Sequence, residues 1–127
     1  MSSAEPPGAP GELDFCYLTT TGRVSGLPHR IEIWFALEDS TVYLLAGGGR
    51  RADWVQNLAA EPVVTLALAG REHAARARVV HDGEEAALAR RLLYDKYSRR
   101  YGASLERWRD SALPVAVDVG ASVDLAR

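Results

Sequence analysis

The chain has 127 residues, of which 47% are hydrophobic and 25% are charged, and this is the length and composition of one ordinary soluble domain that can bury a sizeable core. Its formal net charge of −2 argues against a general nucleic-acid-binding protein, and its apolar runs are too short to cross a membrane, so we expect a cytoplasmic protein without stable membrane insertion. The single cysteine, Cys16, excludes an intrachain disulfide.

The first part of the chain predicts an arm followed by two strands. Residues 1–12 are rich in proline and small residues, so we expect a flexible arm in front of one domain that spans residues 13–127. The aromatic and β-branched residues of 15–21 predict a strand, and the glycines within 22–26 predict a tight turn after it. Partial alternation of apolar and polar residues predicts a second strand over 29–37.

A third strand, a glycine-rich turn and a short helix come next. The apolar run 41–46 predicts the strand, and the short polar turns between the first three strands predict an antiparallel meander. Three glycines, 47–49, follow directly. The spacing of the apolar residues then predicts a short helix over 51–60, which Pro62 ends.

The second half of the chain adds strands and one long helix. The expected elements are, in chain order, strands over 63–68 and 71–80, a helix over 83–101 that Asp82 caps, one or two further helical turns within 104–110, and a closing strand over 113–119. Six strands with one short and one long helix predict a mainly β, α+β fold. A small antiparallel barrel suits so short a chain because it leaves few sheet edges open.

The glycine-rich turn is a candidate phosphate site. Glycines let the backbone adopt positive φ and approach a ligand closely, and the start of a helix offers N–H groups to an anion. Arg50 and Arg51 add planar, permanently charged groups that suit phosphate. The alternative is an ordinary turn followed by solvated arginines.

Several short motifs occur together in one order. The first is YLTTTGRVSGLPHR over residues 17–30, and the second is AGGGRRADWVQNLAAEPVVTLAL over residues 46–68. In this order and spacing they resemble the deazaflavin-dependent nitroreductase branch of the split β-barrel flavin and deazaflavin oxidoreductases. Trp108 and residues 113–115 also resemble the family's closing strand, so the resemblance extends over about residues 13–119.

The resemblance implies a homodimeric, six-stranded antiparallel split β-barrel that holds coenzyme F420 in a groove. Phosphate ligands are then expected from the hairpin and from the turn before the short helix. The implied cofactor-binding residues are Thr21, Arg23, Ser25, Arg30, Trp34, Gly47, Gly48, Gly49, Arg50, Arg51, Trp54 and Asn57. Val24 stands where the family carries a lysine, and the basic pair also resembles the phosphate grip of pyridoxamine-phosphate-oxidase-like proteins, so FMN is the alternative cofactor.

The chemistry that the resemblance implies is hydride transfer between reduced deazaflavin and an electron-poor small molecule, such as an activated alkene, a quinone or a nitro compound. Tyr94, Tyr97 and Tyr101 recur at three- and four-residue spacing on the long helix. As candidate catalytic residues they would line the substrate pocket and donate the accompanying proton, whereas the alternative is core packing. The three histidines lack metal-ligand spacing, so we expect no metal site.

Two other functions remain open from the sequence. One is an FMN-dependent oxidoreductase, and the other is a non-catalytic protein that carries a flavin, a deazaflavin or a haem-related ligand. Enzyme and carrier need the same phosphate grip, so the pocket residues do not separate them. The expected partners are a small-molecule substrate and a second copy of the chain, without nucleic acid.

Overall fold

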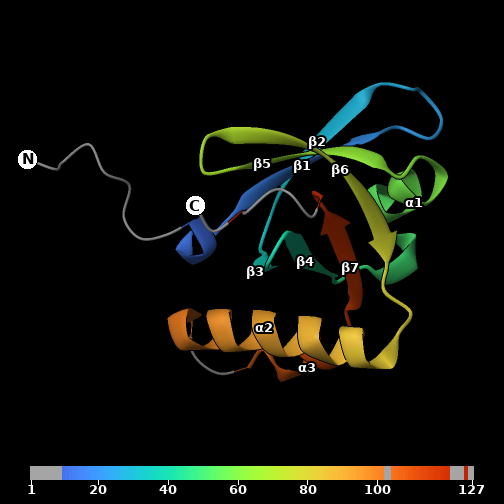
Figure 1. The fold of residues 1–127 in the computed structure, drawn as a ribbon. Coiled ribbons are helices and arrows are strands. Elements are labelled where there is room, and N and C mark those ends of the chain that lie inside the picture. Colours follow the sequence, from blue (N-terminus) through green and yellow to red (C-terminus); the bar gives the residue numbers. More distant parts are fainter. Residues whose placement is uncertain (1–9, 102–103, 121–124, 126–127) are drawn as a thin grey trace, which may run out of the picture.

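One antiparallel sheet dominates the fold, and α2 and α3 lie together along one side of it (Figure 1). The computed structural model describes residues 10–101, 104–120 and 125, and within these residues the sheet has seven strands. The strands are β1 (Cys16–Thr21), β2 (Pro28–Ile33), β3 (Ala36–Glu38), β4 (Thr41–Ala46), β5 (Val63–Leu68), β6 (Arg71–Val79) and β7 (Leu113–Asp118). The α-helices are α1 (Asp53–Ala60), α2 (Gly83–Tyr101) and α3 (Glu106–Ser111), and the 3-10 helices are η2 (Pro10–Glu12) and η3 (Gly49–Arg51).

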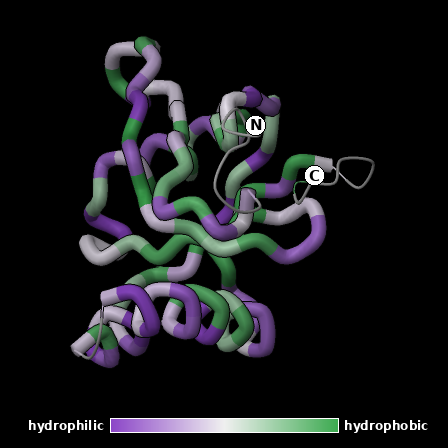
Figure 2. Tube along the Cα trace, turned by 90° about the vertical axis from the view of Figure 1, so that its left-hand side faces the viewer, coloured by the Kyte–Doolittle hydropathy of each residue, from purple (hydrophilic) through white to green (hydrophobic). Residues whose placement is uncertain are grey.

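The sheet curls because its two edge strands are neighbours in the chain. Its strand order is β2-β1-β5-β6-β7-β4-β3, so β2 and β3 lie at opposite edges. Trp34 and Phe35 alone connect them, and the sheet must therefore bend round until its edges meet at this connection. The result is a half-barrel that is split between β2 and β3, and the β1–β2 hairpin projects from it, away from the helical layer (Figure 2).

The predicted strand over 29–37 is wrong as a single strand. It breaks at Trp34 and Phe35, which raises the predicted six strands to seven among the described residues. The backbone N–H of the fully buried Phe35 bonds to the Tyr97 hydroxyl instead of a neighbouring strand. The predicted meander of the first three strands is wrong for the same reason, since β2 pairs with β1 whereas β3 pairs with β4.

The described residues form two hydrophobic cores, which we call the barrel core and the helix-side core. Along β4, Val42 and Leu44 face the barrel core, whereas Tyr43 and Leu45 face the helix-side core beneath α2. Alternate residues of a strand point to opposite faces, so a strand that is covered on both faces must be apolar throughout. This explains why residues 41–46 read as a continuous apolar run.

The helices mostly begin and end where the sequence predicts. Helix α2 spans Gly83–Tyr101 as expected, and the Asp82 carboxylate caps it by accepting a hydrogen bond from the Glu85 N–H at 2.8 Å. Helix α1 ends before Pro62, but η3 replaces the first turn of its predicted range. The further turns within 104–110 form α3, so the described part of the chain has three α-helices instead of two. The predicted arm lies outside the described residues except for η2. None of the described helices is long and apolar enough to span a membrane.

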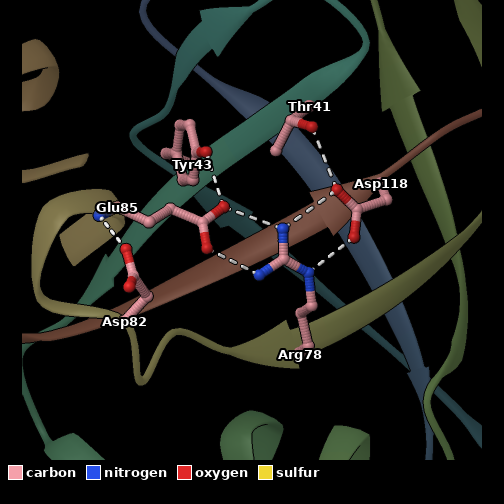
Figure 3. Close-up of polar contacts among 6 residues, drawn as sticks. All are labelled: Thr41, Tyr43, Arg78, Asp82, Glu85 and Asp118. Carbon is pink, nitrogen blue, oxygen red and sulfur yellow. Dashed lines mark hydrogen bonds and ion pairs between the residues drawn. The ribbon is translucent and has the colours of Figure 1, made fainter. Parts of the chain in front are cut away.

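An ion-pair network joins the start of α2 to the sheet (Figure 3). Arg78 of β6 donates two hydrogen bonds of 2.8 Å to the Glu85 carboxylate of α2 and two, of 2.7 Å and 3.3 Å, to the Asp118 carboxylate of β7. From β4, the Tyr43 hydroxyl donates to Glu85 at 2.7 Å and the Thr41 hydroxyl donates to Asp118 at 2.9 Å. The Arg78 guanidinium therefore connects β6 with α2 and β7, and the two carboxylates connect β4 to the same network.

This network should make the protein less stable in acid. Hydrogen bonds from Arg78, and then from Tyr43, lower the pKa of Glu85 from 4.5 to about 2. The stabilisation is complete above the unfolded-state pKa and is lost as the pH falls toward the folded-state value. We expect Glu85→Gln to lower the free energy of unfolding by only about 1 kcal/mol at pH 7, because the pair is partly exposed. At pH 3 the loss should be much smaller, because most of this stabilisation is already absent from the unmodified protein.

Urea unfolding at both pH values measures this difference, and Glu84→Gln, at the exposed neighbouring position, is the matched control. The control should keep the pH dependence of the unmodified protein. If Glu85→Gln lowers the free energy of unfolding equally at the two pH values, the ion pair between Glu85 and Arg78 does not stabilise the fold.

Candidate cofactor site

A cavity of about 290 Å³ lies between the turn of the β1–β2 hairpin and the start of α1. We call it the hairpin cavity. Its lining residues are Gly22, Arg23, Val24, Ser25, His29, Asp53 and Asn57. The structure therefore brings together the predicted hairpin ligands Arg23 and Ser25 and the predicted helix residue Asn57, although more than thirty positions separate Arg23 from Asn57 in the sequence.

Asn57 holds the hairpin against α1. Its side chain is 4% exposed, and its Oδ1 accepts hydrogen bonds from the Arg23 backbone N–H at 3.1 Å and from Arg23 Nη1 at 2.8 Å. Its Nδ2 donates to the buried Thr20 hydroxyl at 3.2 Å. The Arg23 guanidinium is thus fixed in place, and its remaining partner, Asp53, lies 3.3 Å away with a side chain that is 87% exposed. Such an exposed pair contributes little, so phosphate oxygens can replace the Asp53 carboxylate.

The hairpin turn is built closely around Gly22. A Cβ at this position would lie 2.6 Å from His29 Nε2 and 2.7 Å from Ser25 Oγ, so a larger residue would displace these two side chains of the cavity. Gly26 has a positive φ of 73°, and Ser25 Oγ accepts a hydrogen bond from the Leu27 N–H at 3.1 Å. The Ser25 hydroxyl can still donate its proton, so the turn presents a fixed donor beside Arg23.

The glycine-rich turn leads through η3 into α1. Among its glycines, all of which are described, Gly49 has a positive φ of 63°, whereas Gly48 has an ordinary helical conformation that other residues adopt. Arg50 and Arg51 are exposed and do not line the hairpin cavity. Ala52, the N-cap of α1, makes no side-chain hydrogen bond, so the first N–H groups of the helix remain available to a ligand.

Other predicted ligands lie elsewhere. Arg30 stacks over the Tyr17 ring at 4.5 Å and lines a different cavity of about 430 Å³. Adjacent residues of β2 face opposite sides of the sheet, and it is His29 that faces the hairpin cavity. Thr21 is the half-buried last residue of β1, and Trp54 packs against the barrel core, as does the helix that it belongs to.

Trp34 lies in an aromatic cluster under α2. Its ring is stacked on Tyr97, with centroids 4.2 Å apart and planes 2° apart, and on Tyr101 at 5.2 Å and 10°. Trp108 of α3 meets Trp34 edge-on at 5.5 Å. The cluster therefore joins the split in the sheet to both helices of the helical layer.

The Tyr97 hydroxyl is occupied by backbone groups. Tyr97 is fully buried, and its hydroxyl accepts a hydrogen bond from the Phe35 N–H at 2.9 Å and donates to the Asp14 carbonyl at 2.7 Å. Burial raises the pKa of this hydroxyl. These contacts favour the core-packing alternative for Tyr97 over a role in proton transfer.

The other two candidate tyrosines are more accessible. Tyr101 is 52% exposed, and its hydroxyl donates to the Asp14 carboxylate at 2.9 Å, which raises the pKa of the tyrosine. The Tyr94 hydroxyl donates to the Glu106 carboxylate at 2.8 Å, with the same effect on its pKa. Tyr101 is thus the most exposed member of the stacked cluster, whereas Trp34 is partly buried.

Thr20, Asp53 and His29 are not among the cofactor-binding residues expected from the sequence. Asp53 and His29 line the hairpin cavity, and Thr20 supports it through its hydrogen bond with Asn57. Alternation along β1 carried the signal for Thr20, because Cys16, Leu18 and Thr20 all point inward. The contact of Asp53 with Arg23 had no local signal, since it depends on how α1 docks against the hairpin.

The chain is similar to known proteins in sequence and in fold. A family model described as F420H(2)-dependent quinone reductase matches residues 8–120, and no curated protein matches the sequence significantly. A solved F420-H2 dependent reductase, FDR-A, is 21% identical over 83% of this chain and 93% of its own, with a TM-score of 0.65. A structure described as a domain-swapped dimer is 22% identical over 83% of this chain and 79% of its own, with a TM-score of 0.66.

A third similar structure is HutZ, the heme storage protein from Vibrio cholerae, which is 16% identical over 84% of this chain and 82% of its own, with a TM-score of 0.62. Identities this low show a shared fold alone. The family model, in contrast, covers most of the chain. The chain therefore belongs to the F420H(2)-dependent quinone reductase family, and it is an F420-dependent reductase.

Proposed function

We propose that the protein transfers a hydride from reduced coenzyme F420 to an electron-poor small molecule, which is a quinone, an activated alkene or a nitro compound. The observation that carries this proposal is the fixed Arg23 guanidinium, which Asn57 orients beside the Ser25 hydroxyl. This donor set suits a phosphate group. Bound coenzyme F420 supplies the hydride chemistry, so the chain needs only to bind, orient and exclude water.

The residues proposed to hold the cofactor lie at the two ends of β2. Arg23 and Ser25 precede the strand and Trp34 follows it, and six residues of extended chain span roughly 20 Å. A ligand that contacts both ends must be elongated, as a deazaflavin ring with a phosphate-bearing tail is. Arg50 and Arg51, just before α1, would donate further hydrogen bonds to the phosphate.

The accessible end of the aromatic cluster is the proposed place for the electron acceptor. Tyr101 is stacked on Trp34 and half exposed, so it can contact a planar acceptor and direct a hydroxyl toward it. Tyr97 acts as a positioning residue for Trp34, since its ring is stacked on Trp34 and its hydroxyl is hydrogen-bonded to the Phe35 backbone. Tyr94 bonds to α3 and would shape the rim of the acceptor site.

We further propose that the protein is a homodimer. Val24 and Leu27, on the projecting hairpin, are 92% and 62% exposed, and a second subunit would cover them. The similar structure described as a domain-swapped dimer supports this arrangement. Sedimentation of the purified protein should give twice the mass of the chain.

Titration and turnover test the function. Coenzyme F420 added to the purified protein should bind with a change in its fluorescence, and reduced coenzyme F420 should be oxidised when menadione or a nitroaromatic compound is added. Arg23→Gln should weaken F420 binding by about 1.5 to 3 kcal/mol, whereas Arg71→Gln, which removes an exposed charge elsewhere, should not.

The other outcomes of this experiment identify the alternatives. Binding without turnover would mean a carrier protein. A yellow purified protein that retains FMN and does not bind coenzyme F420 would indicate an FMN-dependent oxidoreductase.

A further inference from the structure

A third cavity, also of about 430 Å³ but distinct from the one that Arg30 lines, lies between the C-terminal half of α2, strand β3 and η2. We call it the basic cleft. Its lining residues are Gly11, Glu12, Ala36, Leu37, Leu92, Lys96, Arg99 and Arg100, and none of them belongs to the hairpin cavity. The cleft combines an apolar floor with three cationic side chains from successive turns of one helix.

Lys96 is a half-buried ammonium group without a carboxylate partner. Its Nζ donates to the Phe35 carbonyl at 2.9 Å and lies 3.7 Å from the centroid of the Phe35 ring. No carboxylate lies within ion-pair distance of it in residues 10–101, 104–120 and 125. Burial, and then the charge of Arg100, lower the pKa of Lys96 from 10.5 to about 8. An ammonium has three donors, so a further acceptor would be favoured at this position.

The neighbouring charges are unequally neutralised. Arg100 bonds to the Asp14 carboxylate and to the Glu12 carbonyl, so it is already paired. Arg99 bonds through Nε to the Asp95 carbonyl at 3.0 Å, which leaves its two terminal nitrogens. Glu12 is the acidic group in the lining, and it is exposed.

Three further groups lie near Lys96 on the elements packed against it. The charge of the Asp14 carboxylate raises the pKa of Lys96, but this carboxylate is already paired with Arg100. Burial raises the pKa of the Cys16 thiol of β1 to about 12, so this thiol is neutral. Tyr97, whose ring lies 5.0 Å from Lys96 Nζ, is also neutral, because burial raises its pKa. The deep end of the cleft is therefore positive.

We propose that the basic cleft binds a small organic anion with an apolar body, such as a medium-chain fatty acid. The carboxylate would accept charge-assisted hydrogen bonds from Lys96 and Arg99, and the hydrocarbon would cover Ala36, Leu37 and Leu92. A cavity of this size is within the range of small-molecule sites. This site is separate from the hairpin cavity and does not rest on the proposed hydride transfer.

Calorimetric titration of the full chain with octanoate tests the proposal. Octanoate should bind at least about tenfold more tightly than octanamide, which has the same hydrocarbon body without the charge. Lys96→Met keeps an apolar side chain of similar length and should weaken octanoate binding about tenfold or more. Arg91→Met, which removes an exposed charge from the same helix outside the cleft, is the matched control and should bind octanoate normally.

The pH dependence of binding gives an independent measurement. Octanoate remains ionised above pH 7, so its affinity should fall by about tenfold or more between pH 7 and pH 10, as Lys96 loses its proton. Lys96→Arg keeps its charge and should remove this dependence. Titrations near pH 8 in buffers of different ionisation enthalpy should show proton uptake on binding.

Three results would overturn the proposal. These are equal affinity for octanoate and octanamide, equal effects of Lys96→Met and Arg91→Met, and an affinity of the unmodified protein that does not change with pH. Circular dichroism of each variant establishes that it is folded. If Lys96→Met fails to fold, Arg99→Gln replaces it and should weaken octanoate binding at least about threefold.

Discussion

Replacing Tyr97 by phenylalanine should lower the free energy of unfolding by about 2 to 3 kcal/mol. The Tyr97 hydroxyl is the hydrogen-bond partner of the buried Phe35 N–H and of the Asp14 carbonyl. Phenylalanine would fill the same space and keep the stacking on Trp34, but it would leave two backbone groups without this partner. The loss falls at the split in the sheet, where β2 passes into β3.

Urea unfolding at pH 7, followed by tryptophan fluorescence, measures this effect. Tyr94→Phe is the matched control, because its hydroxyl bonds to Glu106 at an exposed position, and it should change the free energy by less than about 1 kcal/mol. Equal values for the two variants would show that the buried hydroxyl contributes no more than a surface one. A Tyr97→Phe protein of unchanged stability and reduced turnover would instead support the catalytic role predicted from the sequence.

Replacing Arg50 and Arg51 together by alanine should weaken the binding of coenzyme F420 by about 2 to 5 kcal/mol. Both side chains are exposed and lie directly before α1, whose first N–H groups have no side-chain cap. Charge-assisted hydrogen bonds to phosphate are the interactions that this change would remove. Folding should be unaffected, because neither side chain is part of a core.

Fluorescence titration with coenzyme F420 measures the loss, and the double variant of Arg71 and Arg91 removes the same charge from exposed positions outside the hairpin cavity. Screening should keep the effect of this control below about 1 kcal/mol. If the two double variants bind the cofactor equally well, the glycine-rich turn is not part of the phosphate grip. Arg23→Gln, measured beside them, shows whether the hairpin holds the phosphate alone.

The local elements of this protein could be predicted from the sequence because their causes are local. Asp82 caps α2 through a contact three residues away, and Pro62 limits α1 by lacking a backbone donor. The apolar run of β4 and the alternation of β1 follow from the twofold periodicity of a strand. The order of the motifs identified the family for the same reason, since each motif is a short stretch with a backbone requirement of its own, as the positive φ of Gly26 in the hairpin turn shows.

The site depended on contacts between distant residues. Nothing in residues 29–37 reveals that the strand breaks at Phe35, because the break is held by a hydroxyl that lies 62 positions later in the chain. The docking of α1 places Asn57 where it bonds to both Arg23 and Thr20. Thr20, and not the predicted Thr21, therefore supports the position of Arg23. The face on which a residue of β2 lies decides that His29 reaches the hairpin cavity and Arg30 does not. Periodicity and propensity describe neighbours along the chain, whereas these pairings depend on which surfaces the folded sheet and helices bring into contact.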